Sequence, residues 1–169
     1  MREAKYHTGG KRLGAAAVDG LVFAPLIMVN QWISASTQNL DVLISWTVLA
    51  ALAPVFYSII LHYKYGQTIG KWAFALKVLH ISETRTLTLN ESILRDIPYL
   101  LVEIFALGYL VFLAKKENFN DFPQFDDFTA APLFIWNLLE VTTLLTNYKR
   151  RAIHDFIARS VVVRADASG

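Results

Sequence analysis

Long runs of apolar residues, separated by short polar segments, dominate the chain. Four of these runs lie near residues 13–33, 42–63, 93–113 and 130–146. A helix over 13–33 would extend about 31 Å at roughly 1.5 Å per residue, which matches a hydrocarbon core about 30 Å thick. The pattern therefore predicts an all-α fold: a polytopic membrane helical bundle with four transmembrane helices, in a single domain over residues 1–169.

The segments between the apolar runs predict smaller features. "TLNE", residues 88–91, has the spacing of a capping box and predicts the start of the third helix. "LKVLHIS" and "SVVVR" are short and β-branched, so they either pair as a small cytoplasmic two-stranded ribbon or form extended tails. The acidic and aromatic loop over residues 117–128 favours an interfacial anchor, and an acidic vestibule that gathers cations is the alternative.

Basic residues are concentrated in three of the five segments that flank the apolar runs. They precede the first run, separate the second from the third, and follow the fourth, whereas residues 34–41 contain no Lys or Arg. Because cytoplasmic loops carry an excess of Lys and Arg, we expect both termini on the cytoplasmic side of the inner (plasma) membrane. The first run is longer than a signal core and is interrupted by Asp19, which predicts a retained helix.

Composition narrows the range of functions. The 169 residues are 54% hydrophobic and 18% charged, fewer charges than the roughly 25% of soluble domains. A net charge of +2 is too small to argue for nucleic acid, and the absence of cysteine excludes disulfides and thiolate metal sites. The four histidines lack metal-ligand spacing, and "IHDF" is typical of a cap or an ion pair. We therefore expect no enzyme, no metal site and no cofactor, and a lipid bilayer as the main partner.

Charged residues within the apolar runs are the candidates for function. A carboxylate at such a depth costs about 3 kcal/mol on insertion scales, so it must face protein or a wet cavity. Asp19 lies in the first run, and Arg12 precedes it on the same helix face. The other candidates are Arg95, Asp96, Glu103 and Glu140. Two interpretations stay open: a static charge network, in which Asp19 lies near Arg95 or Arg12, and a path for cations and protons.

Three motifs in order resemble a known family. "RLGAAAVD" lies in the first helix, "GQTIGK" follows the second, and "RRAIHDFIARSVVV" lies near the end of the chain. Together they resemble the RDD family of prokaryotic integral membrane proteins, which is named for one arginine and two aspartates. By this resemblance Arg12 is the family arginine, Asp19 the first aspartate and Asp155 the second, and Arg95 opens the third helix. The cytoplasmic motif residues are Gly66, Gln67, Thr68, Gly70 and Lys71.

"GQTIGK" differs from a phosphate-binding loop, which needs four residues between its glycines and a hydroxyl after its lysine. Here three residues separate the glycines, and Trp72 follows Lys71, so we expect no nucleotide. We expect Asp155 at the cytoplasmic end of the bundle, near this motif.

The resemblance also implies a function. Sodium–proton antiport has been attributed to some relatives, and others look like accessory partners of membrane enzymes. We expect cation/proton exchange or small-solute transport, with monovalent cations and protons as partners. The alternative is a non-catalytic accessory protein that binds and regulates another membrane protein. A chain of 169 residues offers little room for a pathway, so transport would call for a homo-oligomer.

The predicted topology can be tested with reporter fusions. Fusions after Leu40, Arg85, Asp121 and Arg164 should report outside, inside, outside and inside, because the basic segments are retained in the cytoplasm. A periplasmic signal at Arg164 would contradict a bundle of four spanning helices.

Overall fold

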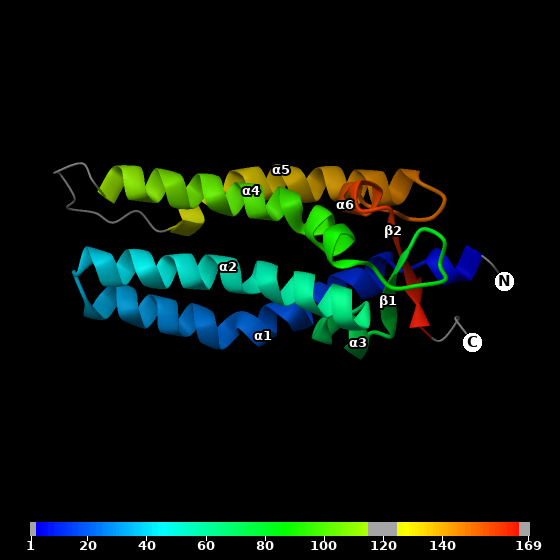
Figure 1. Ribbon diagram of the computed structural model, residues 1–169, viewed down its shortest axis with the longest axis horizontal. Coiled ribbons are helices and arrows are strands. Elements are labelled where there is room, and N and C mark those ends of the chain that lie inside the picture. Colours follow the sequence, from blue (N-terminus) through cyan, green and yellow to red (C-terminus); the bar gives the residue numbers. More distant parts are fainter. Residues whose placement is uncertain (1–2, 115–124, 166–169) are drawn as a thin grey trace.

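The computed structural model describes residues 3–114 and 125–165, and this part of the chain is mostly helical (Figure 1). In chain order the elements are η1 (Glu3–Tyr6), α1 (Gly9–Ser36), α2 (Leu40–Tyr65), α3 (Ile69–Ala73), β1 (Leu76–His80), α4 (Leu89–Ala114), α5 (Phe125–Thr146), α6 (Ile153–Ile157) and β2 (Ser160–Arg164). Figure 1 shows two pairs of long helices, α1 with α2 and α4 with α5. The short elements η1, α3, α6, β1 and β2 gather at one end of the bundle, called the sheet end below.

Each of the four apolar runs lies within one long helix, so the prediction of a helical fold is confirmed. Among the described residues, α1 and α2 are the two helices long and apolar enough to cross a membrane. In α5 the corresponding apolar stretch, Leu133–Thr146, is shorter. Residues 117–124 of the acidic and aromatic loop lie outside the described residues, and residues 125–128 begin α5, so the role predicted for the loop stays a prediction.

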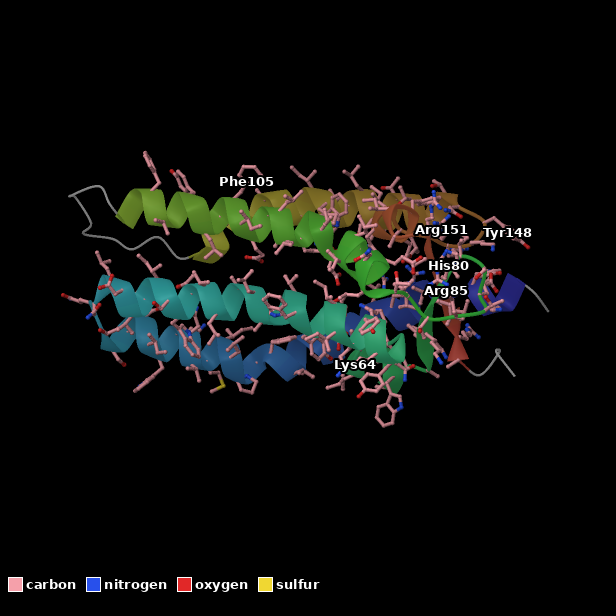
Figure 2. All side chains as sticks on the ribbon, in the orientation of Figure 1. Lys64, His80, Arg85, Phe105, Tyr148 and Arg151 are labelled. Atoms are coloured by element: carbon pink, nitrogen blue, oxygen red, sulfur yellow. The ribbon has the colours of Figure 1, made fainter. Side chains whose placement is uncertain are left out.

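Large apolar side chains cover the outside of the long helices. Leu21 and Phe105 are 71% and 76% exposed, and Figure 2 shows Phe105 on the outer side of α4. In water such extended apolar surface would drive association, whereas in lipid it contacts acyl chains. The outer surface therefore fits a bilayer.

The ends of the helices are fixed by local hydrogen bonds. The side chain of Asn39 accepts hydrogen bonds from two backbone N–H groups at the start of α2. Gly66 ends α2 with a φ of 69°, a left-handed conformation that favours glycine, and its carbonyl accepts a hydrogen bond from Val78 N–H in β1. Thr88 and Glu91 bond each other's backbone N–H at the start of α4, as the capping-box spacing predicted.

The strands β1 and β2 pair antiparallel, with Val78 opposite Val162. One face of this sheet packs on Ala15 of α1, and the other packs on Tyr6 of η1. Because both faces are covered, most residues of the two strands are buried, three of five in β1 and four of five in β2. The sheet thus joins the end of the chain to the start of α1.

A carboxylate ties three segments together beside the sheet. Glu83 accepts hydrogen bonds from Lys5 Nζ at 2.6 Å, Tyr6 Oη at 2.5 Å and Lys149 Nζ at 3.2 Å. Burial disfavours the charged form of Glu83, but these donors outweigh it and lower its pKa to about 2. Glu83 therefore holds η1 and the segment after α5 against the turn that follows β1.

Candidate functional site

A fully buried carboxylate, that of Asp155 in α6, lies at the centre of the sheet end. Its Oδ2 lies 2.9 Å from Arg12 Nη1, and its Oδ1 lies 3.1 Å from Arg95 Nη2. Ser160 Oγ and the backbone N–H of Ala152 also donate to it, at 2.9 and 3.2 Å. Burial alone would raise the pKa of Asp155, but the charges around it, with Arg95 and Arg12 in direct contact, outweigh burial and hold this pKa well below its usual range. Asp155 is therefore ionised and fully paired.

Arg12, in the first turns of α1, connects this carboxylate to two other segments. Its Nη2 donates to the carbonyl of Arg150 at 2.9 Å, and its Nε donates to Thr8 Oγ1 at 3.1 Å. All three guanidinium nitrogens therefore have acceptors, which satisfies a charge that is expensive to bury. This side chain clamps the segment between α5 and α6 onto α1.

Arg95 connects Asp155 to a second group, the ring of His154. Its Nη2 lies 2.9 Å from His154 Nε2, and because a guanidinium can only donate, Nε2 is the acceptor. The ring proton of His154 therefore sits on Nδ1, which contacts Glu140 Oε1. Glu140 also accepts hydrogen bonds from Tyr99 Oη at 3.1 Å and Trp136 Nε1 at 2.9 Å. This chain of contacts joins α6 to α4 and α5.

Asp19 in α1 caps the short helix α3. Its Oδ1 accepts hydrogen bonds from Tyr57 Oη and from the backbone N–H of Gly70, both at 2.8 Å. Its Oδ2 accepts from Thr68 Oγ1 at 2.6 Å. The hydroxyl of Thr68 in turn accepts from the N–H of Lys71 at 3.3 Å. A negative charge at a helix N-terminus satisfies its free N–H groups, which explains why an aspartate interrupts the apolar run.

The motif "GQTIGK" contacts α1 closely. A Cβ atom on Gly70 would lie 2.0 Å from the carbonyl oxygen of Ala15, so only glycine fits there. Lys71 follows at the next position, and burial lowers its pKa to about 8, an effect that Arg95 increases and that Asp19 and Asp96 partly offset. The motif therefore positions a half-buried lysine beside the bundle.

A cavity of about 360 Å³ opens among α2, α4 and α5 next to these groups. Its apolar wall includes Pro54 and Leu133. Its ionisable lining residues are His62, Lys71, Arg95, Asp96, Glu103 and His154. Ionisable side chains that share one cavity between apolar helices make it the candidate site for a solute.

The residues predicted from the sequence fall into three groups. Arg12, Arg95 and Asp155 form one cluster at the sheet end, the end of the bundle where α3 of the "GQTIGK" motif also lies. Asp96, Glu103 and Lys71 line the cavity, and Glu140 adjoins it through Tyr99 and His154. The third group is the cap of α3, which consists of Asp19, Thr68 and Gly70. Gly66 ends α2, and nothing described for Gln67 assigns it a role.

The expected pairing of Asp19 with Arg95 or Arg12 is wrong. Within the described ranges, the ion pairs of both arginines go to Asp155, and Asp19 forms none. The physical reason is that three hydrogen-bond donors near α3 already satisfy the Asp19 carboxylate.

A comparison with known protein families identifies the family of the chain. A family model described as the RDD family matches residues 6–159. The chain belongs to the RDD family. No curated protein and no solved structure matches the chain. Family membership and two apolar helices of spanning length together indicate a membrane protein.

Sequence reasoning on this RDD-family chain missed the histidines of the site. The interpretation of "IHDF" as a cap or an ion pair holds, because His154 pairs with Glu140 and Asp155 accepts from the N–H of Ala152, but the link from His154 to Arg95 was not predicted. His62 was not singled out, although it is buried in the cavity wall. One available signal was the position of His62 four residues after Ser58, which places both polar side chains on one face of an apolar helix.

The contact between α3 and α1 predicts a large difference between two glycine substitutions. Gly70→Ala should destabilise the protein by about 1–3 kcal/mol or more, because the added methyl group collides with the backbone of α1. Gly20→Ala is the matched control, since a Cβ atom there meets nothing within 4 Å. Thermal unfolding in detergent measures both, and equal stability of the two variants would contradict the docking of α3.

Proposed function

We propose that this RDD-family protein exchanges protons for a monovalent cation or another small charged solute at the cavity between its helices. The observation that carries the proposal is the set of ionisable groups on the cavity wall, among them Asp96 and Glu103. A carboxylate between apolar helices is costly unless it is paired or wetted, so its presence favours a role in binding. In this proposal the carboxylates take up a proton and a cation in alternation.

The proposal includes four spanning helices, α1, α2, α4 and α5, in the inner membrane. Their long axes are roughly parallel in Figure 1, which supports it, because all four helices would then cross one bilayer with the sheet end on one side. Figure 2 labels Lys64, His80, Arg85 and Arg151 at or near the sheet end. Basic residues favour the cytoplasmic side, so the sheet end with the described start and end of the chain would face the cytoplasm.

An accessory protein that binds and regulates another membrane protein is the second candidate. It is favoured by the complete pairing of Asp155, because a carboxylate whose oxygens are fully occupied by two arginines and other donors holds a structure and leaves no place for an ion. In that case the cluster would keep the bundle rigid for a partner. A homo-oligomer is compatible with both candidates.

Exchange in proteoliposomes separates the two candidates. An imposed pH gradient should dissipate when sodium, lithium or potassium is added, and Glu103→Gln should slow this dissipation strongly. The amide keeps the shape of the side chain but neither holds a proton reversibly nor offers a full negative charge. Asp41→Asn is the control, because Asp41 is an exposed carboxylate in the first turn of α2, outside the cavity.

The folded yield in detergent accompanies each rate, so that a loss of folding is not mistaken for a loss of exchange. Wild-type protein that dissipates no gradient with any of the three cations, at any pH tested, would reject exchange of these cations and favour the accessory role.

A further inference from the structure

Two hydrogen-bond donors in the cavity wall have no acceptor. Arg95 is 3% exposed, and its Nη1 is buried without a hydrogen-bond partner, although its Nη2 contacts Asp155 and His154. Lys71, which is half-buried, lines the same cavity from α3, and no hydrogen bond or ion pair of the described residues involves its Nζ. Both donors are positively charged, and they come from different elements of the fold.

Two acceptors in the same wall also have no donor. Asp96 is 8% exposed, and its Oδ2 is buried without a hydrogen-bond partner. Ser58 Oγ lies 3.1 Å from His62 Nδ1, and the buried His62 Nε2 has no partner. In the tautomer in which Nδ1–H donates to Ser58 Oγ, His62 Nε2 is an acceptor.

An unsatisfied buried polar group costs about 1–3 kcal/mol, and more if it is charged. We infer that the cavity binds a small zwitterion of the amino-acid class, with its carboxylate on Arg95 and Lys71 and its ammonium group on Asp96 and His62. Such a ligand supplies acceptors to the two free donors and N–H donors to the two free acceptors. The inference deepens the proposed function, on which it rests for the idea that the cavity handles a solute.

A simpler ligand would satisfy either the free donors or the free acceptors of the cavity wall, but not both. A metal cation would contact Asp96 and leave Arg95 and Lys71 without acceptors. An inorganic anion would contact the two basic groups and bring negative charge towards Asp96. The cavity volume of about 360 Å³ lies within the range of roughly 300–1,000 Å³ of small-molecule sites. Its apolar wall, which includes Val55 and Leu133, leaves space for a small apolar side chain on the ligand.

Equilibrium binding to the full chain in detergent tests the inference. The probes are glycine, L-alanine, L-leucine and L-glutamine, with propionate and ethylamine as the two halves of alanine. At least one amino acid should bind, and alanine should bind about tenfold or more tighter than either half, since each tenfold step requires only 1.4 kcal/mol. Halves that bind as tightly as alanine, or a panel in which no amino acid binds, would overturn the inference.

Two variants assign the ends of the ligand. Asp96→Asn should remove the preference for alanine over propionate, and Lys71→Met should remove the preference for alanine over ethylamine. The controls are Asp41→Asn and Lys64→Met, which change exposed residues outside the cavity and should keep both preferences. Variants that keep both preferences while their fold is intact would contradict the assignment.

Binding in detergent is independent of exchange in proteoliposomes. Amino-acid binding without exchange would therefore leave the inference standing and reject the proposed function. Exchange of sodium without amino-acid binding would support the proposed function and overturn the inference.

Discussion

The buried carboxylate of Asp155 accepts contacts from segments that lie far apart in the chain, and the arrangement of the sheet end depends on them. Arg12 brings α1 to it, Arg95 brings α4 to it, and Ser160 brings the first residue of β2. None of these partners can leave without exposing a charge to a low-dielectric surrounding, where an unpaired ion is far more costly than in water. The two helix pairs are thereby fixed relative to each other at the sheet end.

This arrangement divides the charged residues of the helices between structure and binding. Asp155 and Asp19 are satisfied by donors on every side, one by arginines and the other by the start of α3. The cavity next to them differs, because Asp96 Oδ2 and Arg95 Nη1 are buried with no partner. Arg95 belongs to both parts, since one of its nitrogens holds Asp155 and another faces the cavity wall. Arg12, Asp19 and Asp155 therefore hold the structure together. Arg95 and Asp96 line the cavity.

Much of the fold follows from the sequence, because apolar runs, a capping box and β-branched segments act locally. The helices and the start of α4 at Thr88 were predictable for that reason. The partner of Asp19 was not, because it is the backbone of α3, about fifty residues away, and a backbone N–H group leaves no mark in the sequence. The cavity also could not be predicted from the sequence, since it depends on which faces of α2, α4 and α5 meet. Charge pairing was the right principle, but it was applied to the wrong aspartate.

A double-mutant cycle on Arg12 and Asp155 tests most directly whether their pairing holds the structure. Arg12→Gln and Asp155→Asn should each lower the free energy of unfolding in detergent by about 3–5 kcal/mol, because each removes the partner of a buried charge in the cluster. The double variant should cost clearly less than the sum of the two single variants, since both single variants lose the same contact between Arg12 and Asp155. The exposed pair of Arg85 and Glu91 is the matched control, and its substitutions should be nearly additive. Additive losses at Arg12 and Asp155 would contradict the account.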